Sequence, residues 1–570
     1  MKRISAILIL AMGACSTAIT GGVPASQASR AQAILALDEL KIPDANDVRG
    51  NITLPAMTGK LPGMSIRWKS SNAEIVSDEA RGELAAGVVT RPRPGAAPAR
   101  VTLDACITAA DGAVCRTFVL TIRPAVQLAP YTRYAMFNFA RSNSQQGQQI
   151  YAAASVGNDP TQWVAVNGGK ALLESTLGMH GVRDPSIVRS PEGDKFYLIA
   201  TDLNVDATAH GWRGWDWAQT DASRYIEVWE STDLHTWSAQ RHVLVAPEEA
   251  GMTFAPEAIW DPSIGAYVVY WTSSMYPHGT HFSSDRNDAN RRFPVTRNQT
   301  LYATTRDFVT FTPPQVMSGR PGHGTLDAVM IRDEEQGIYY RFVSDRISTG
   351  VGVTRYAADC PSEDIYQERA ASVRAAPDQW TLVATCLTHR TMKTTYAEAP
   401  MIVEANGGDS RGKGYYLWAD QKWAGSPAGK PMEEQLSPYW SASLASGTWA
   451  PVKWKTPDYD LALGVIRHGH VSAITQAEHA SLRGAALVSL VVAGPGRTTY
   501  RKGESLDLSA LHVTASYSDG VTGETIVPGY GGYVVIGYDA NTVGSQTPAV
   551  CFAVGETRKC ASFTVTVQDP

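Results

Sequence analysis

A motif of one acidic residue, an apolar strand, a polar turn and a second apolar strand recurs four times in this chain of 570 residues. The copies contain RDPSIV, APEAIW, LDAVMI and EAPMIV, and their acids are Asp184, Glu257, Asp327 and Glu398. These acids are 73, 70 and 71 residues apart, and 70 further residues lead to His468 in VIRHGHVSAIT. A regular period is typical of a repeat fold, in which each unit buries its apolar face against its neighbour. We therefore expect a ring of repeats, each pointing one ionisable residue at a common centre.

A second pattern recurs out of phase with the first, in the segments IYAAASVGNDPTQW, YIEVWESTDLHTW, LYATTRDFVTF and YWSASLASGTW. Each segment is a strand, a turn rich in Asp, Asn or Ser, and a returning aromatic residue. Together the two patterns give about four strands per repeat, which is typical of a propeller blade. Five blades fit residues 130–482, and the strand at residues 131–141 is expected to complete the last blade and join the two ends. Helical periodicity is scarce, which argues against an α/β barrel and predicts an all-β protein.

The segments on either side of the repeats predict separate β-sandwich domains, because they contain short alternating strands between turn signals. ITLPAMTGKLPG, IRWKSSNAEIVS and TFVLTIRP resemble the atrophied bacterial Ig-like domain that often precedes secreted glycosidases, and TTYRKGESLDLSALHVTASYSDG and SFTVTV resemble bacterial Ig-like domains. The predicted organisation is a signal peptide and tether (1–32), an Ig-like domain (33–125), a five-bladed β-propeller (130–482) and a second Ig-like domain (486–570). We expect the Ig-like domains to act as spacers, or the second one as a weak cell-surface or glycan adhesion module.

The N-terminus predicts export, because Lys2 and Arg3 precede a short apolar run, Ile4 to Ala14, and then small residues. The run is too short to span a bilayer. Cys15 follows Met-Gly-Ala, which resembles a degenerate lipoprotein processing site, so a lipid anchor at Cys15 and ordinary cleavage further on, for example after Ala28, both stay open. The expected location is periplasmic, extracellular or, as a lipoprotein, on the outer surface.

The other six cysteines fall into local pairs: Cys106 and Cys115, Cys360 and Cys386, Cys551 and Cys560. An exported protein favours disulfides, and no pair has the CxxC spacing of a zinc site. The formal net charge is only −5 and no basic stripe is present, which argues against a nucleic acid or an anionic membrane as partner. We expect a monomer that acts on a polysaccharide or an oligosaccharide.

The acids ahead of the repeated strands predict a funnel in which several carboxylates face each other. Mutual repulsion and burial raise some of their pKa values, as a general acid at neutral pH requires. Glycoside hydrolysis needs such a pair, with one protonated acid for the leaving oxygen and one carboxylate for water or the sugar.

The motifs VRDPSIV, FAPEAIW, TLDAVMI, AEAPMIV and RHGHVSAIT, in this order and spacing, resemble the blade motifs of glycoside hydrolase family 43, the five-bladed inverting arabinosidases and xylosidases. The resemblance covers about residues 131–482. It implies that Asp184 is the general base that deprotonates water, that Asp327 raises the pKa of the proton donor and orients it, and that Glu398 is the general acid. Base and acid are then expected about 6.5–9.5 Å apart.

Five further residues are predicted to contact substrate: Trp215, Trp271, Glu257, Gln421 and His468. Trp215 belongs to the loop at residues 210–217, which is long enough to overhang the pocket, while Trp271 and Gln421 end acid-bearing strand pairs. For Glu257 a purely structural role at the start of its strand stays open. His468 matches the histidine of the RHG motif, which contacts a buried calcium ion or water in many members, and a satisfied core histidine is the alternative. No cofactor is expected to be required, with Ca²⁺ as a possible structural ion.

The resulting prediction is an inverting glycoside hydrolase that removes α-L-arabinofuranosyl residues from plant polysaccharides or oligosaccharides. The choice of arabinose follows the commonest activity of the family that the chain resembles. A β-xylosidase or a galactose-directed exo-glycosidase is the close alternative, and a non-catalytic glycan-binding propeller protein is the alternative of another class. A retaining five-bladed fructosidase shares the Arg-Asp-Pro motif, but its Trp-Met-Asn-Asp-Pro-Asn-Gly and Glu-Cys signatures are absent.

Overall fold

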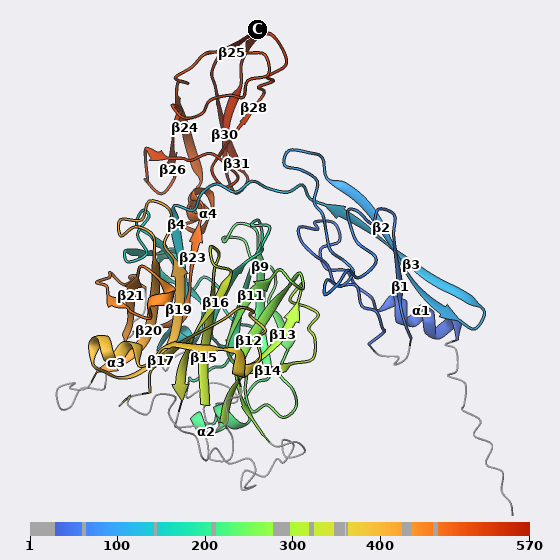
Figure 1. The fold of residues 1–570 in the computed structure, drawn as a ribbon, viewed down its shortest axis with the longest axis vertical. Helices are drawn as coiled ribbons and strands as arrows, with labels where there is room; N and C mark the ends of the chain where they lie inside the picture. Colours follow the sequence, from blue (N-terminus) through green and yellow to red (C-terminus); the bar gives the residue numbers. More distant parts are fainter. Residues whose placement is uncertain are drawn as a thin grey trace, which may run out of the picture.

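The protein is mostly β in the computed structural model (Figure 1), which describes residues 29–59, 64–141, 145–206, 212–276, 297–318, 324–346, 360, 363–423, 435–459 and 465–569. Within these ranges no helix is both long and apolar enough to cross a membrane. The predicted export signal, Cys15 and the first two residues of the loop at 210–217 lie outside the described residues.

The central region consists of five four-stranded antiparallel sheets. In spatial order their strands are β7 (Val182–Arg189), β8 (Phe196–Asp202), β9 (Tyr225–Ser231) and β10 (Arg241–Leu244); β11 (Phe254–Asp261), β12 (Ala266–Met275), β13 (Arg297–Thr305) and β14 (Gln315–Ser318); β15 (Gly324–Asp333), β16 (Ile338–Arg346), β17 (Ile365–Ala370) and β18 (Thr381–Ala384); β19 (Thr394–Glu404), β20 (Tyr415–Trp423), β21 (Gln435–Ser441) and β22 (Ala450–Pro451); β23 (Val465–Ile474), β4 (Arg133–Arg141), β5 (Tyr151–Ser155) and β6 (Trp163–Ala165). We call β7, β11, β15, β19 and β23 the ring strands, because each contacts the next and β23 contacts β7.

The last sheet contains both ends of the central region, because β23 pairs antiparallel with β4. The strand expected at residues 131–141 is therefore present, and β5 and β6 join it in the same sheet. Gly469 makes this pairing possible, since a side chain there would lie 1.8 Å from the carbonyl oxygen of Phe137 in β4. Only glycine fits such a close backbone approach.

Apolar packing between neighbouring sheets forms the core. Five buried clusters each join two adjacent sheets, and one of them contains Phe137 of the last sheet and Leu198 of the first. Because both faces of a sheet pack against neighbours, strands such as β8 are buried along their whole length. This explains why the repeated strands are continuous apolar runs rather than alternating ones.

The N-terminal region contains helix α1 (Arg30–Asp38) and one sheet of β1 (Arg67–Ser70), β2 (Ala99–Ala109) and β3 (Gly112–Ile122). The predicted tether was expected to reach residue 32, but α1 begins at Arg30, where Ser29 and Gln32 form a capping box. Apolar residues of α1 pack on the sheet, which explains why this segment is ordered. The strands predicted near residues 52–57 and 87–92 form only isolated bridges.

The C-terminal region contains three three-stranded sheets: β24 (Leu487–Ala493), β26 (His512–Tyr517) and β27 (Glu524–Thr525); β25 (Thr499–Arg501), β32 (Val565–Gln568) and β29 (Gly544–Gln546); β28 (Tyr533–Ile536), β30 (Ala549–Val554) and β31 (Thr557–Ser562). Helix α4 (Gln476–Leu482) connects it to the ring strand β23. The three predicted disulfides, Cys106–Cys115, Cys360–Cys386 and Cys551–Cys560, are present.

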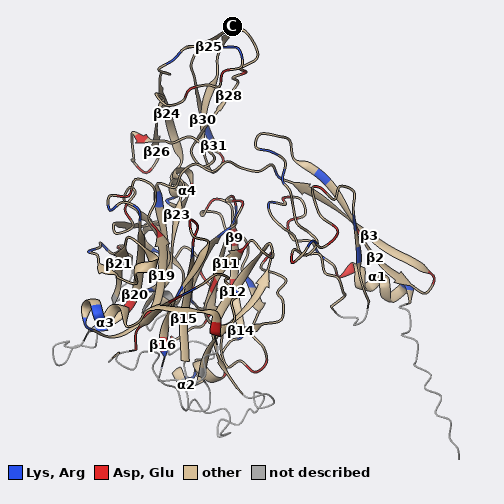
Figure 2. Ribbon diagram, in the orientation of Figure 1, with Lys and Arg blue, Asp and Glu red and all other residues tan. Residues whose placement is uncertain are grey.

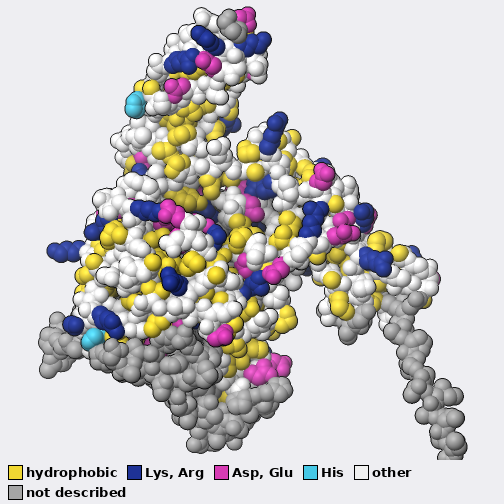
Figure 3. All heavy atoms as spheres, viewed as in Figure 1, with side chains coloured by type: hydrophobic (Ala, Val, Ile, Leu, Met, Phe, Trp, Pro, Cys, Tyr) yellow, Lys and Arg dark blue, Asp and Glu magenta, His cyan; other side chains and the backbone are white. Residues whose placement is uncertain are grey.

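Polar contacts connect the flanking regions to the central sheets, from which they project as separate lobes (Figure 3). The guanidinium of Arg306 donates hydrogen bonds to the carbonyl oxygens of Ile52, Ala85 and Ala86 in the N-terminal region. Asp194, which is almost fully buried, pairs with Arg49 and Arg91. Basic and acidic residues are interspersed over the rest of the molecule in the view of Figure 2.

Because the carbonyl oxygen of Phe137 lies so close to Gly469, we expect that any side chain at residue 469 destabilises the pairing of β23 with β4. Gly469→Ala should push β23 away from β4 and lower the free energy of unfolding by about 1–3 kcal/mol, the usual cost of overpacking. Thermal unfolding should show a lower transition temperature. Gly407→Ala is the matched control, since a side chain there would contact nothing within 4 Å. An unchanged transition for Gly469→Ala would contradict the proposed steric requirement.

Candidate active site

Each ring strand contains a β-bulge, at which two residues lie outside the regular pairing with the next strand. The bulged residues are Asp184 and Pro185, Ala255 and Pro256, Asp327 and Ala328, Ala399 and Pro400, Arg467 and His468. A bulge changes the direction in which a side chain points and is frequent next to active sites. The first bulged residue has a positive φ in four of the strands, 48° at Asp184 and 51° at Asp327 among them.

The nearly equal sequence spacing predicts that the four acids occupy the same position in each repeat, but the structure shows that their positions relative to the bulges differ. Asp184 and Asp327 occupy the same bulge position, whereas Glu398 directly precedes its bulge and Glu257 directly follows its own. The side chains therefore do not all point at one centre in the same way. The first bulged residues, Asp184, Ala255, Asp327 and Ala399, are 71, 72 and 72 residues apart, so the acid spacings of 73, 70 and 71 reflect small offsets of the acids from a regular bulge position.

Asp184 is held by donors from two other strands. One carboxylate oxygen, Oδ1, lies 3.2 Å from Nδ1 of His468, and the other accepts a hydrogen bond of 2.9 Å from the Thr201 hydroxyl. Burial alone raises the pKa of Asp184, but the hydrogen bond and charge of His468, with the charge of Arg183, hold it below the usual range. Burial lowers the pKa of His468, yet contact with Asp184 raises it to about 9. At neutral pH the two residues form a carboxylate–imidazolium pair.

Glu398 accepts hydrogen bonds from three side chains. Its Oε1 lies 2.7 Å from Arg467, and its Oε2 contacts the Tyr396 hydroxyl and lies 3.4 Å from Arg346. Burial and the charge of Glu398 raise the pKa of Tyr396 well above its usual value, so this hydroxyl stays protonated and donates. Arg467 also donates to Asp420 over 2.5 Å, which fixes the guanidinium between two carboxylates.

Asp327 differs from the other two acids, since its carboxyl group makes no hydrogen bond to any residue that the structure describes. Only its backbone N–H is bound, to the Thr272 hydroxyl at 3.1 Å. Burial raises the pKa of Asp327 to about 7, with the charges of Glu398 and Asp184 adding to the effect and those of His468 and Arg346 opposing it. A carboxyl group that titrates near neutrality therefore lies within electrostatic range of the carboxyl groups of Asp184 and Glu398.

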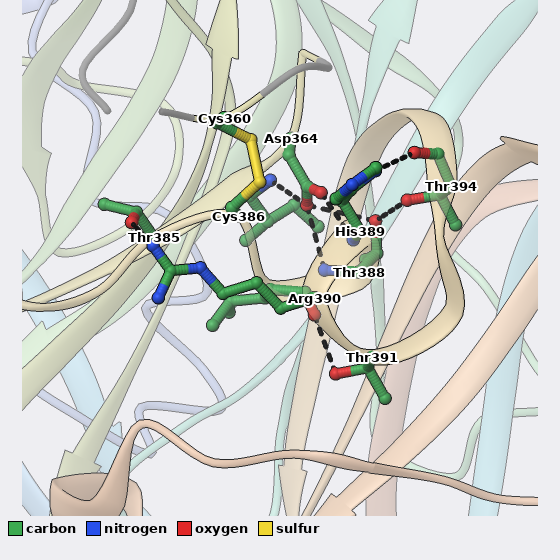
Figure 4. Close-up of a disulfide and its surroundings, with 11 residues drawn as sticks. Cys360, Asp364, Thr385, Cys386, Thr388, His389, Arg390, Thr391 and Thr394 are labelled. Carbon is green, nitrogen blue, oxygen red and sulfur yellow. Dashed lines mark hydrogen bonds between the residues drawn. A yellow bond between two sulfur atoms is a disulfide. The ribbon is translucent and has the colours of Figure 1, made fainter. Parts of the chain in front are cut away.

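A disulfide and a small hydrogen-bonded cluster support the strand that carries Glu398 (Figure 4). Cys386 precedes α3 (Leu387–Met392), and the buried carboxylate of Asp364 accepts bonds from the backbone N–H groups of Thr388 and His389 at 3.0 and 2.7 Å. Thr388 in turn bonds the Thr394 hydroxyl, at the first residue of β19. These contacts fix the beginning of β19, four residues before Glu398.

Four of the five residues predicted to contact substrate are buried: His468, which faces Asp184, and Trp271, Gln421 and Glu257. The Trp271 side chain is 1% exposed in the core between the first two sheets, and its indole N–H donates to Ser273. Gln421 is fully buried and bonds the Tyr439 hydroxyl. Position at the end of a strand pair was the reason for both predictions, but the two side chains point between sheets, so they are corrected to core residues. Glu257, 3% exposed, accepts a bond of 2.6 Å from Ser186, which favours its structural alternative.

Trp215, by contrast, is 50% exposed at the start of α2 (Trp215–Thr220). In Figure 1 this helix lies at the end of the central sheets opposite α4 and the C-terminal region. Its exposed ring is available to a ligand at the end where Asp184 lies, because the neighbouring Arg183 contacts it.

The sequence interpretation missed Arg183, Arg346, Tyr396 and Arg467, which surround the three acids. The sequence could have pointed to two of them. Arg467 belongs to the RHG motif. Tyr396 precedes Glu398 by two residues, so the side chains of Tyr396 and Glu398 lie on the same face of their strand. Arg346 comes from another sheet and had no signal near the acid that it contacts.

Nδ1 of His468 faces Asp184, and calcium prefers oxygen ligands, so the contact that the structure shows for this ring is with a carboxylate. A structural calcium ion near His468 stays a prediction. Two sets of potential ligands occur elsewhere in the described ranges: Cys360, Asp364 and Cys386, and Asp202, Glu227 and His242. The first is excluded because its cysteines form a disulfide. The expectation that no cofactor is required stays a prediction.

Three carboxyl groups with different partners, brought to one end of five β-sheets, define a protein of the glycosidase class. Residues 129–480 match the family described as a probable glycosyl hydrolase domain, related to glycoside hydrolase family 43, and the chain belongs to this family. Residues 28–125 match the atrophied bacterial Ig domain and residues 494–567 the bacterial Ig-like domain of group 3. The two flanking regions are therefore Ig-like.

An α-L-arabinofuranosidase of Bifidobacterium longum subsp. longum is 34% identical over 349 residues, which are 58% of this chain and 31% of that protein. The chain thus spans about a third of the length of this relative. Among solved structures, a thermostable family-43 glycoside hydrolase is 15% identical with a TM-score of 0.31, covering 69% of this chain and 97% of that one. An α-L-arabinofuranosidase from Lactobacillus brevis is 13% identical with a TM-score of 0.31, covering 64% and 88%.

The pair of Asp184 and His468 predicts a pH-dependent stability. Because the folded pKa of His468 is about 9, above its usual 6.5, the pair should stabilise the fold fully below pH 6.5 and lose this contribution as the pH rises through 9. At the acid end the contribution should disappear as the pH falls through the lowered pKa of Asp184. Urea unfolding from pH 6 to 10 should show the alkaline loss in the wild type and not in His468→Gln. His512→Gln, at an exposed position, is the control and should keep the wild-type curve.

Trp271 and Trp215 should respond to substitution in opposite ways. Trp271→Ala removes a buried ring and should lower the free energy of unfolding by about 3–5 kcal/mol. Trp215→Ala should change the free energy of unfolding by less than about 0.5 kcal/mol, as is usual at the surface, and weaken saccharide binding. Thermal unfolding and a saccharide titration of both variants test this. A stable Trp271→Ala variant with weakened binding would restore Trp271 to the substrate site.

Proposed function

We propose that the protein is an inverting glycoside hydrolase that removes α-L-arabinofuranosyl residues from a polysaccharide or an oligosaccharide. The observation that carries the proposal is the convergence of Asp184, Asp327 and Glu398, from three different sheets, around His468 and Arg467. The identity of 34% to an α-L-arabinofuranosidase supports the choice of sugar. A β-xylosidase or galactose-directed activity is the alternative that the same machinery supports.

We propose further that the central region is a five-bladed β-propeller with the site at one end of its axis. The five four-stranded sheets, the contacts of each ring strand with the next and the five apolar clusters support this arrangement. In this geometry ring strands from all blades approach the axis, so residues about 70 positions apart in sequence become neighbours.

In the proposed mechanism Asp184, ionised and oriented by His468 and Thr201, accepts a proton from the attacking water. The water oxygen bonds the anomeric carbon on the face opposite the leaving group, and Glu398 protonates the glycosidic oxygen as its bond to the sugar breaks. Arg467, Arg346 and Tyr396 then stabilise the carboxylate that Glu398 becomes, because charge-assisted hydrogen bonds are strong. Asp327 is placed to influence the proton donor electrostatically.

The three disulfides and the Ig-like regions support an exported protein. A monomeric state and either a lipid anchor at Cys15 or ordinary cleavage further on, for example after Ala28, are also part of the proposal and rest on the sequence alone.

The decisive experiment is a screen of nitrophenyl α-L-arabinofuranoside, β-xyloside and galactosides, together with arabinan and arabinoxylan. We expect release from the arabinofuranoside, and proton NMR should show the inverted anomer first. Retention would contradict the role of Asp184 as base. No release from any substrate would favour a glycan-binding protein without activity.

The proposed roles predict how variants depend on the leaving group. Glu398→Gln should lower kcat for a natural glycoside by about 10²–10⁴-fold, the usual contribution of a general acid, and much less for a dinitrophenyl glycoside, which needs no protonation. Asp184→Asn should lower activity on both. Glu404→Gln, at an exposed position in the same strand, is the control and should retain wild-type kcat. Equal losses on the two substrates for Glu398→Gln would exclude it as the acid.

A further inference from the structure

Arg183 is a buried cation that contacts no carboxylate of the residues that the structure describes. Its side chain is 8% exposed, and its one hydrogen bond to a described residue goes to Oε1 of Gln148 over 3.0 Å. The guanidinium lies between two aromatic rings, 4.2 Å from the centre of Phe139 and 5.6 Å from that of Trp215. Two aromatic neighbours and one amide leave most of its five N–H donors without an acceptor among the described residues.

Other buried arginines of the described central region have compensating acceptors. Arg189, Arg341, Arg346 and Arg467 each pair with a carboxylate, and Arg306 donates to backbone carbonyls. The charges of Asp184, Glu398 and Asp420 offset the charge of Arg183 through space, but most of its N–H donors lack an acceptor among the described residues. Buried donors without acceptors cost free energy, so such a group is usually retained for a ligand. Burial lowers the pKa of Arg183 to about 10, which still leaves it charged at neutral pH.

The carboxylates nearest to Arg183 already have their own cations. Asp184, the next residue, faces His468, while Glu398 and Asp420 share Arg467. Arg183 also directly precedes the bulge of its strand, the position that Glu398 occupies in β19. The strand geometry therefore places Arg183 at the same level of the ring as the proposed acid, with its charge available to a ligand.

We propose that Arg183 and Trp215 form a subsite for a carboxylate-bearing sugar, a uronic acid residue of the substrate. The planar fork of a guanidinium matches a carboxylate with two parallel hydrogen bonds, and its contacts with Phe139 and Trp215 fix the plane of the fork. The half-exposed ring of Trp215 offers an apolar surface on which a sugar ring can stack. This inference rests on the proposed function, because it names the class of glycan that the same site would bind.

Calorimetric titration with D-glucuronate and D-glucose tests the subsite without requiring turnover. The wild type should bind glucuronate about tenfold or more tightly than glucose, as one charge-assisted pair would give. Arg183→Gln should lose this preference, and Arg183→Lys, which keeps the charge but not the fork, should retain part of it. Arg369→Gln, at an exposed position of β17, is the control and should keep the full preference.

Two outcomes would overturn the inference: equal affinity of the wild type for the two sugars, or a preference that survives in Arg183→Gln. Acetate at the same ionic strength separates a uronate subsite from a site for any small anion, and binding of acetate as tight as that of glucuronate would also overturn it. Thermal unfolding of each variant shows whether the protein is folded. If Arg183→Gln does not fold, Arg183→Lys still tests the subsite.

Activity provides a second, independent readout. Arg183→Gln should raise KM for an arabinofuranosyl oligosaccharide that bears a uronate and leave KM for its neutral counterpart within about twofold. If the wild type hydrolyses neither substrate but shows the glucuronate preference, the proposed function fails and the subsite stands. If it hydrolyses both substrates with the same KM and Arg183→Gln changes neither, the subsite fails and the hydrolase stands.

Discussion

The pairing of β23 with β4 is the constraint on which the rest of the structure depends. It brings residues 465–474 beside residues 133–141 and thereby places the fifth sheet between the fourth and the first. Each sheet can then bury both of its faces against neighbours, which is where most of the favourable free energy of folding arises. Without that pairing the first and fourth sheets would each expose an apolar face. The absence of a side chain at Gly469 is the local condition for it, since the carbonyl of Phe137 occupies that space.

The same closure explains how several carboxyl groups can be buried together. Ionised carboxylates lose hydration when they are buried, and they are tolerated where cations and hydrogen-bond donors replace the water. Here the fifth ring strand supplies both main cations, as Arg467 contacts Glu398 and Asp420 and His468 contacts Asp184. Among the described residues Asp327 has no such partner, and burial raises its pKa to about 7. The three acids therefore differ in the residues that contact them, and these contacts, rather than the residue type, distinguish the roles that we propose for them.

The flanking regions are tied to the central sheets through polar contacts that leave the site free. Arg306 and Asp194 connect the N-terminal region, and α4 leads into the C-terminal region at the end of the sheets away from α2 (Figure 1). Such contacts orient a domain without adding chemistry, which is consistent with the expectation that the Ig-like regions act as spacers. The half-exposed Trp215 and the buried Arg183 that contacts it lie at the opposite end, where we propose the glycan subsite.

Periodicity and residue type in the sequence predicted the mostly β fold, the repeated strand pairs, the joining of the two ends and the three disulfides, and the resemblance to known families predicted the Ig-like regions. Periodicity also singled out Asp184, Asp327 and Glu398 as candidates, because an acid within an apolar strand is unusual at any single site and more so at a regular spacing; their catalytic roles came from the resemblance and stay a proposal. The sequence could not show that Glu257 and Glu398 lie at other positions relative to their bulges than Asp184 and Asp327. Nor could it show that Trp271 and Gln421 point between sheets, because an offset of one residue in a strand reverses the face to which a side chain points. Only the tertiary structure decided which cation faces which acid, because Arg346, Arg467 and His468 lie on other strands than the carboxylates that they contact. It also showed that Arg183 contacts Phe139 and Trp215 and no carboxylate of the described residues, an arrangement that depends on tertiary packing and has no counterpart in the sequence pattern.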